Sequence, residues 1–334
     1  MNAAIPRDLL DAVKEGQCVL FLGAGVHSPP PQESPYVYPE EDRLPLGDKF
    51  SQALADECIA ELDEESRNDV VDPNATNMQR AEVERQQREE QREKKRQYLR
   101  KYCGALQRTS WFYQVIQRNR ASLVNKIKTS LDNGKQPSPL VRALAEIDFP
   151  VVITTNYDRL FEKAVRSFQK EPAIRIYKKD AAVPTKDFPG DLPTPQEPWL
   201  FKMHGCVSEP ESLVITDEDY IHFVMRMGDS EDFHPVPQKL RAKFKERPTL
   251  FVGYSLFDYN LRLLFRTLRR RVDVSEWPAT FSLDPWPDLL VVASYGAPVG
   301  TGSASPLVSF IEQDSWRFVP ELYQSVIGRE MPTK

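Results

Sequence analysis

Four short groups of small or polar residues in this chain are suited to binding and transforming a nucleotide, and each follows an apolar run. The first is Gly23-Ala24-Gly25, followed by Val26. Glycines after a strand let the backbone turn sharply and approach a pyrophosphate, which the N-terminus of a following helix can face. The third glycine of the dinucleotide fingerprint is missing, because Ser28 stands at its position. This group alone therefore fits an ordinary strand-to-loop turn equally well.

The second group runs from Thr154 to Asp158 and begins at the end of a β-branched run. Open α/β sheets place their ligands at the carboxyl ends of their strands. Asn156 offers both a hydrogen-bond donor and an acceptor there, and Asp158 offers an acceptor for ribose hydroxyls. The competing interpretation is that Asn156 or Asp158 only caps the next helix. Both interpretations stay open, with capping alone the weaker one for Asn156.

The third group is His204-Gly205, directly after another apolar run. An imidazole at a strand end can act as a general base or bind a substrate hydroxyl, although a lone histidine is more often structural. The fourth group is Gly253-Tyr254-Ser255-Leu256, with Asp258 shortly after it. It can hold the adenosine end or the phosphates of a nucleotide, while Ser255 or Asp258 can also cap the following helix.

The apolar runs before these groups predict strands, and helical periodicity fills the segments between them. Expected strands cover residues 17–22, 151–155, 199–203, 250–252 and 288–293. Expected helices cover residues 5–15, 139–147, 158–168, 236–246 and 257–272. Strands that alternate with helices predict an α/β fold that is Rossmann-like and doubly wound, with a mostly parallel sheet.

The segment between the first and the second expected strand differs in amino-acid composition from the alternating strands and helices. Residues 29–45 are dense in proline, which excludes a regular helix and predicts an ordered loop or a flap. Helical spacing follows over 46–62 and 110–131. Between them, residues 76–103 consist mostly of Arg, Glu, Gln and Lys. Their apolar content is too low for a buried helix, so they predict an exposed or partner-facing one.

Composition narrows the class of protein. The chain has 334 residues, with 44 basic and 49 acidic side chains and a net charge of −5, so direct nucleic-acid binding is not indicated. The first 16 residues lack the apolar core of a signal peptide, and no apolar run approaches the ~20 residues that span a bilayer. The chain's 4 cysteines are widely spread, which argues against disulfides and against a zinc site. We expect a cytoplasmic protein without a membrane partner.

Taken as an ordered set, the four groups resemble the sirtuin family, in its bacterial NAD-consuming branch. The resemblance rests on Gly23-Ala24-Gly25, Thr154 to Asp158, Lys202-Met203-His204-Gly205, and Gly253 to Leu256 with Asp258. It covers most of residues 13–270. It implies one sirtuin-like domain, with a Rossmann-like NAD-binding core in residues 1–28 and 137–334 and a proline-rich loop plus helical insert subdomain in residues 29–136.

The resemblance also implies a role for each matching residue. Asn156, Asp158 and His204 would be catalytic, with the first two on the nicotinamide side and His204 near the adjoining ribose. The glycine turn would line the phosphates, and Ser255 would meet the adenosine half. The residues expected to bind NAD are Gly23, Ala24, Gly25, Val26, Thr155, Gly253, Ser255 and Leu256.

Two departures from the family pattern refine the expected activity. Members usually carry Ser where this chain has His27, which either takes over that contact or plays no part. Protein-deacylating members usually carry a four-cysteine zinc module after the His-Gly pair, whereas residues 206–248 contain only Cys206. No zinc is therefore expected, and the resemblance shifts from a deacylase toward an NAD glycohydrolase.

The expected function is cleavage of NAD to nicotinamide and ADP-ribose, in an effector subunit of a bacterial anti-phage defence system. Because uncontrolled loss of NAD would kill the host, activity is expected to be gated. We expect a homo-oligomer, or a partner in trans such as a HerA-type ATPase or helicase or another sensor subunit. The proline-rich stretches 29–45 and 172–198 are the expected gate. The alternatives are an NAD-dependent protein deacylase and a non-catalytic nucleotide-binding scaffold.

Overall fold

The computed structural model describes residues 5–71, 77–117, 119–179, 182–229, 233–256, 277–296 and 306–333. The chain divides into two compact units, and each is described by itself. The first unit comprises residues 1–44, 128–214 and 220–334, and the second comprises 45–127 and 215–219. Residues 29–44 and 128–136, which the sequence assigned to the insert, thus belong to the first unit.

The first unit is built on a sheet of seven parallel strands in the order β3-β4-β2-β1-β5-β6-β7. The chain adds strands first on one side of β1 and then on the other, which is the pattern of a doubly wound sheet. The expected α/β fold with a mostly parallel sheet is therefore confirmed. The strands are β1 (Val19–Leu22), β2 (Val151–Thr154), β3 (Ala173–Ile176), β4 (Trp199–Lys202), β5 (Thr249–Val252), β6 (Thr280–Leu283) and β7 (Ser309–Ile311).

The register of the central strands brings their carboxyl ends to one level. Leu22 at the end of β1 pairs with Thr154 of β2 on one side and with Val252 of β5 on the other. Thr154 pairs in turn with Lys202 at the end of β4. The residues after these four strands are the four groups singled out in the sequence, so the parallel register places those groups along the same edge of the sheet.

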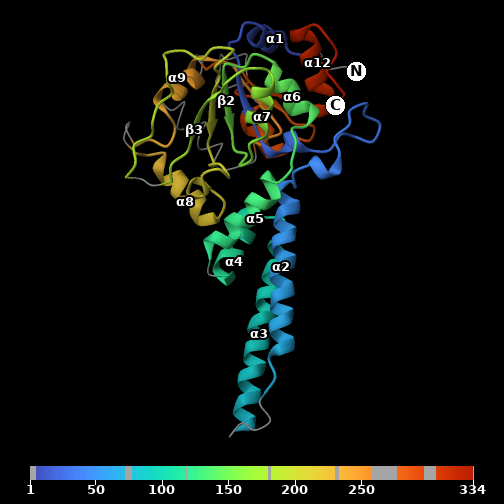
Figure 1. Ribbon diagram of the computed structural model, residues 1–334, viewed down its shortest axis with the longest axis vertical. Coiled ribbons are helices and arrows are strands. Elements are labelled where there is room, and N and C mark those ends of the chain that lie inside the picture. The colour runs from blue at the N-terminus through green and yellow to red at the C-terminus, as the bar shows by residue number, and fades with distance from the viewer. Residues whose placement is uncertain are drawn as a thin grey trace. The chain divides into compact units, whose positions relative to one another are not determined.

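Alternate residues of the strands enter two separate cores, because successive side chains point to opposite faces. Leu20 and Leu22 face a core shared with α1 (Arg7–Lys14), α6 (Pro139–Glu146), α7 (Leu160–Ser167) and α12 (Ser315–Ile327). Figure 1 shows α1 and α12 side by side above α6. Val19 and Phe21 face the other core, to which α8 (Asp217–Arg226), α9 (Gln238–Glu246) and α11 (Leu289–Tyr295) contribute apolar side chains.

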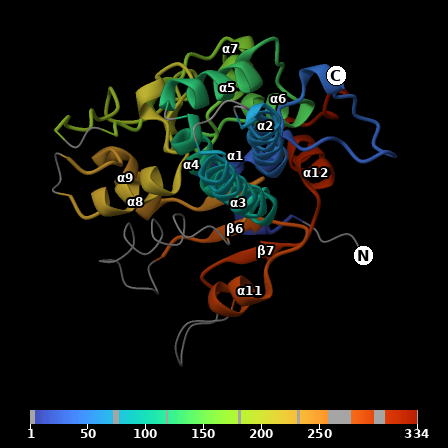
Figure 2. The same cartoon turned by 90° about the horizontal axis from the view of Figure 1, so that it is seen from below.

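The sequence prediction was wrong for one strand and missed others. Residues 288–293 form the start of α11 instead of a strand, because the Asp288 carboxylate accepts hydrogen bonds from the backbone N–H groups of Leu290 and Val291 and caps a helix. Figure 2 shows this helix beside β7, which lies next to β6. The strands β3, β6 and β7 and helix α12 were not expected. The expected helix over 257–272 lies outside the described residues.

The proline-dense segment after β1 is anchored to the rest of the first unit. The indole Nε1 of Trp316 donates to the carbonyl oxygen of Ser28 at 3.1 Å, and the N–H of Val37 donates to the carbonyl oxygen of Thr333 at 2.9 Å. The buried Tyr38 hydroxyl lies 3.1 Å from the carbonyl oxygen of Gln136. These contacts fix the path of the segment. Its regular secondary structure is the short 3₁₀ turn Glu40–Asp42. In the described part of the chain, no helix combines the length and apolarity that crossing a membrane requires.

The second unit is helical and contains α2 (Gly47–Asn68), α3 (Met78–Tyr102), α4 (Leu106–Gln117) and most of α5 (Arg120–Asp132). The single helix predicted over 110–131 is thus two helices. Figure 1 shows α2 and α3 running alongside each other as a long hairpin.

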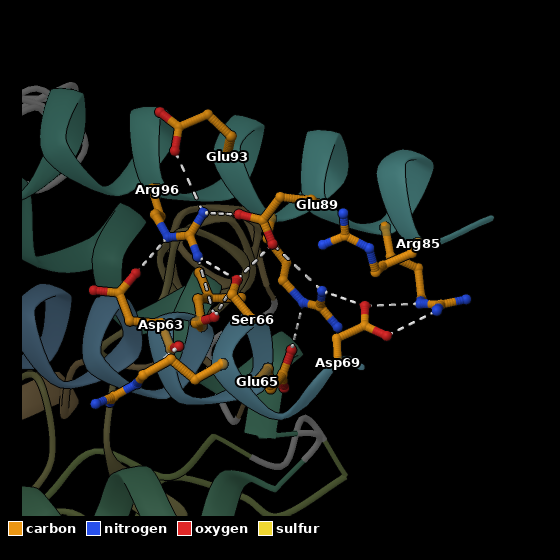
Figure 3. Close-up of polar contacts among 12 residues, drawn as sticks. Asp63, Glu65, Ser66, Asp69, Arg85, Glu89, Glu93 and Arg96 are labelled. Atoms are coloured by element: carbon orange, nitrogen blue, oxygen red, sulfur yellow. Dashed lines mark hydrogen bonds and ion pairs between the residues drawn. The ribbon is translucent and has the colours of Figure 1, made fainter. Parts of the chain in front are cut away.

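The charged residues of α3 find their partners on α2. Arg96 is only 5% exposed, and its guanidinium lies 2.7 Å from Asp63 Oδ1 and 2.6 Å from Ser66 Oγ of α2 (Figure 3). Glu89 of α3 accepts from the same guanidinium at 2.9 Å. Nearby, Asp69 holds Arg92 at 2.7 Å. Polar pairing therefore replaces the apolar seam that usually joins two long helices.

Candidate functional site

A pocket opens at the carboxyl ends of β1, β2 and β4, within the first unit. Polar side chains on it come from the turn after β1, the turn after β2, helix α7 and the end of β4. Concave sites with a few convergent polar groups are the usual places for small-molecule ligands. The lining residues are Leu22, Val26, His27, Val141, Thr154, Asn156, Asp158, Phe161, Glu162 and Lys202.

Asn156 joins the turn after β2 to the turn after β1. Its backbone N–H donates to Thr154 Oγ1 at 3.0 Å, and that hydroxyl donates to the carbonyl oxygen of Leu22 at 3.1 Å. Its side-chain Nδ2 donates to the carbonyl oxygen of Gly23 at 3.2 Å and lies 3.4 Å from His27 Nε2. The amide is therefore held in one orientation at the pocket wall, which a helix-capping role alone does not explain.

Asp158 is a buried carboxylate with partners on both oxygens. Oδ1 accepts from the N–H of Leu160, the first residue of α7, at 2.9 Å, while Oδ2 lies 3.3 Å from His27 Nε2. Burial by itself raises the pKa of Asp158, but the charge and hydrogen bond of His27, the charge of Lys202 and the Leu160 N–H outweigh it and lower the pKa to about 2. Asp158 is therefore an anion at neutral pH that contacts both the start of α7 and the pocket.

A buried ion pair supports this carboxylate from the side of β4. Lys202 Nζ lies 2.8 Å from Glu162 Oε1, and the two side chains are only 1% and 4% exposed. Lys202 also donates to the carbonyl oxygen of Asp158. Burial alone would lower the pKa of Lys202, but Glu162, Cys206 and Asp158 raise it above its ordinary value. The ammonium therefore stays charged and anchors the turn that carries Asp158.

The sequence did not single out Glu162 as a functional residue. A signal was present, because Glu162 follows Asp158 by four residues, and that spacing brings two side chains to the same face of a helix. Lys202 belongs to the motif Lys202-Met203-His204-Gly205, but the sequence pattern assigns it no role of its own. A charged residue that closes an otherwise apolar strand, such as Lys202 after Trp199–Phe201, is a candidate for a buried pair at a strand end.

His204 follows β4 at the same edge of the sheet but does not line the pocket. It is 2% exposed, with Nδ1 3.4 Å from the hydroxyl of Tyr220. The rings of Tyr220 and Phe223 pack edge-on against it. The next residue, Gly205, has φ +86° and lies against Ser212, whose carbonyl oxygen would be 2.3 Å from an added Cβ. The structure thus brings Asn156 and Asp158 together and seats His204 among aromatic side chains.

The glycine turns after β1 and β5 contact each other directly. The N–H of Gly25 donates to the carbonyl oxygen of Gly253 at 2.8 Å, and the N–H of Gly23 donates to that of Val252 at 3.0 Å. A Cβ on Gly23 would lie 2.3 Å from the carbonyl oxygen of Gly253. Gly253 has φ +68°, which favours glycine. Close packing of two backbones therefore requires these glycines, and the N–H groups of Gly23 and Gly25 are already used within the protein.

The remaining predicted binding residues spread along this edge. Val26 is buried and lines the pocket, whereas Ala24 and Ser255 are exposed and Thr155 is half-buried. Leu256 packs in the core that contains Phe21 and Phe251. Apart from Val26, none of the eight predicted NAD-binding residues lines the pocket. Asp258 lies outside the described residues.

The described residues contain no group of three or more His, Cys, Asp or Glu side chains arranged to hold a metal ion. All four cysteines are free thiols, and Cys18, Cys58 and Cys206 are buried. Burial raises the pKa of the Cys18 thiol to about 12, so this thiol stays protonated. The side chains that line the pocket include carboxylate, amide, imidazole, ammonium and hydroxyl groups.

Residues 150–295 match the model of a family described as the SIR2-like domain. The match begins at the start of β2 and includes Asn156, Asp158, His204 and Gly253. The glycine turn and His27 precede the matched region.

Curated relatives match a part of the chain. An NAD(+) hydrolase ThsA of Enterococcus faecium is 27% identical over 128 residues, which is 38% of this chain and 24% of that protein. An NAD(+) hydrolase ThsA of Bacillus cereus strain MSX-D12 is 30% identical over 128 residues, which is again 38% of this chain and 24% of that protein. Defense-associated sirtuin 2 of Bacillus subtilis is 24% identical over 165 residues, or 48% of this chain and 15% of that protein.

The alignments span about a quarter or less of the length of these relatives. The region that matches the domain model carries Asn156 and Asp158, together with strands of the parallel sheet that positions these residues. The expected resemblance is confirmed at this level. Residues 150–295 of this chain are thus similar to the SIR2-like domain, and the relatives named NAD(+) hydrolase ThsA and defence-associated sirtuin are similar to part of the chain.

Proposed function

We propose that this protein is an NAD glycohydrolase, which cleaves NAD with water to nicotinamide and ADP-ribose. The observation that carries the proposal is the pocket itself. Asn156 and the anionic Asp158 line it together, in the region that matches the SIR2-like domain. The names of the aligned ThsA relatives, NAD(+) hydrolase, give the same substrate and reaction for those proteins.

The electrostatics of the pocket suit this bond cleavage. When the glycosidic bond to nicotinamide breaks, its electron pair moves to the ring nitrogen and the ribose carbon becomes cationic. A fixed carboxylate in a water-poor site stabilises developing positive charge without reorganising. Asp158 supplies such a carboxylate, held by His27 and by the N–H of Leu160.

Water must then attack the ribose carbon and lose one proton, which makes ADP-ribose. Asn156 is placed to orient that water or the nicotinamide ribose, because its Nδ2 is fixed on Gly23 and its side chain faces the pocket. We propose that His204 acts from the neighbouring strand end on the same sugar. This role for His204 rests on its position after β4 and not on a place in the pocket wall.

The rest of the expected site extends this proposal along the sheet edge. We propose that the residues around the two glycine turns, from Gly23 to Val26 and from Gly253 to Leu256, together with Thr155, bind the remainder of the NAD molecule. The first unit then provides the NAD-binding core of one sirtuin-like domain, and the second unit is an insert within it.

We propose further that the enzyme is a cytoplasmic effector of anti-phage defence, since one aligned relative is named a defence-associated sirtuin. Gating by a homo-oligomer, or by a partner in trans such as a HerA-type ATPase or helicase, would keep NAD intact in healthy cells. The charged hairpin of α2 and α3 and the proline-rich segments are the surfaces proposed for such contacts.

The test is release of nicotinamide from NAD by the purified chain, compared with Asn156→Ala. Loss of an oriented catalytic group should lower kcat by about 100-fold or more, whereas loss of the hydrogen bond to Gly23 should lower the melting temperature only slightly. Arg166→Ala is the matched control, because Arg166 lies on α7 but pairs only with Glu171 at the surface, 2.9 Å away. Equal turnover by all three proteins would refute the site. Formation of acyl-ADP-ribose only with an acyl-lysine peptide would instead identify a deacylase.

A further inference from the structure

His27 is the histidine of the pocket wall, and its side chain is 4% exposed. It ends the short 3₁₀ turn Ala24–His27 that follows β1. Its Nε2 lies 3.3 Å from Asp158 Oδ2 and 3.4 Å from Asn156 Nδ2. One ring nitrogen thus meets the two residues on which the proposed reaction depends.

The other ring nitrogen has no such contact. Among the described residues, His27 Nδ1 is a buried atom without a hydrogen-bond partner. Leaving a buried polar atom unpaired costs roughly 1–3 kcal/mol, so such atoms in a pocket wall mark places where a ligand completes the bonding. In the neutral form of the ring with its proton on Nε2, toward the carboxylate, Nδ1 keeps a lone pair and is a hydrogen-bond acceptor.

The hydrogen-bond acceptors of the pocket indicate which group of a ligand would bind Nδ1. A sugar hydroxyl that enters a site closed to water requires an acceptor. Both carboxylate oxygens of Asp158 already meet protein donors, Leu160 N–H on Oδ1 and His27 on Oδ2. Oδ2 is thus engaged by Nε2 of the ring, whereas Nδ1 of the same ring has no partner among the described residues.

We propose that His27 contacts the substrate: Asp158 fixes the ring through Nε2, and Nδ1 accepts a hydrogen bond from a hydroxyl of the nicotinamide ribose. This inference rests on the proposed NAD substrate. His27 then binds the substrate directly, beside Asn156 and Asp158. Asp158 has two roles: its negative charge stabilises the cationic ribose, and its contact with Nε2 orients the His27 ring.

Two substitutions separate the nitrogens of the ring. His27→Asn keeps an amide at the distance of Nδ1 from Cβ, but this amide is too short to reach Asp158. His27→Gln places an amide N–H at the distance of Nε2 and removes the atom at the Nδ1 position. A role in holding Asp158 is therefore preserved by Gln, whereas a role in accepting from the ligand is preserved better by Asn.

Binding of NAD and of ADP-ribose, measured by calorimetry, is the first readout. His27→Gln should bind ADP-ribose about tenfold more weakly than the wild type, with a melting temperature close to the wild-type value, because one neutral hydrogen bond is lost. His27→Asn should retain more of the affinity than His27→Gln. Wild-type affinity in His27→Gln, or equal losses in both variants, would overturn the contact.

The second readout does not depend on turnover. The chain has 4 histidines, so ¹⁵N-histidine labelling gives a small set of ring signals, and the His27 pair is assigned by its loss in His27→Gln. Saturating ADP-ribose should move the Nδ1 resonance of His27, while Nε2 stays protonated. An Nδ1 resonance that does not move would refute the contact. If the wild type releases no nicotinamide but ADP-ribose moves Nδ1, the proposed hydrolysis fails and the His27 contact stands.

Discussion

The backbone N–H of Gly25 donates to the carbonyl oxygen of Gly253 at 2.8 Å, although the two residues follow different strands. This bond joins the turn after β1 to the turn after β5. The bond explains why glycines stand at this edge of the sheet even without a ligand, because the two backbones come too close together for side chains to fit between them.

Gly253→Ala tests this packing role. The substitution places a Cβ 2.2 Å from the backbone nitrogen of Val26 and at a φ of +68°, so we expect a loss of more than about 3 kcal/mol in unfolding free energy, measured in urea. Gly190→Ala is the control, since Gly190 has φ +62° but its Cβ would meet nothing closer than 4.0 Å. It should cost only about 1 kcal/mol. Equal losses in the two variants would contradict the packing role.

Asp158 predicts a dependence of stability on pH. Its pKa is lowered from 3.8 to about 2 in the folded protein, so the folded state binds this proton less readily than the unfolded state does. The stabilisation is therefore present above about pH 4 and is lost as the pH falls through the folded pKa. It amounts to about 2 kcal/mol at neutral pH.

Asp158→Asn removes the titrating group and isolates this contribution. The difference in unfolding free energy between wild type and Asp158→Asn should shrink by about 2 kcal/mol between pH 5 and pH 2, measured by urea unfolding at each pH. A difference that stays constant over this range would show that the carboxylate is not held as an anion by His27 and Lys202.

The stability of the α2–α3 hairpin should depend more on the buried Arg96 than on the exposed charged side chains of the two helices. Arg96→Met breaks bonds to Asp63 and Ser66 of α2, so we expect faster amide hydrogen exchange along α3 and a lower melting temperature. Arg80→Met is the matched control, because the exposed Arg80 guanidinium pairs with Glu84 of the same helix, at 3.0 Å. Exchange rates that rise equally in both variants would argue against a special role for Arg96.

The sequence predicted the centre of the sheet well. β1, β2, β4 and β5 are short apolar runs whose strand character follows from buried β-branched and aromatic residues, and polar groups mark where each one ends. The outer strands escaped prediction for local reasons. β3 lies inside a proline-dense segment, and β7 has only 3 residues. At 288–293, apolar residues alone indicated a strand, while the decisive feature was the Asp288 cap.

The sequence by itself determined the α/β class and the presence of Asn156, Asp158 and His204 at strand ends, because hydrophobic period and turn residues are local properties of the chain. Only the tertiary structure decided which of these residues meet. Parallel register brought Asn156, Asp158 and His27 to one pocket, placed His204 among aromatic rings, and pressed Gly25 against Gly253. Most of these contacts join residues far apart in the chain, such as Asn156 and Gly23 with a separation of 133, and such contacts depend on packing that no local pattern encodes.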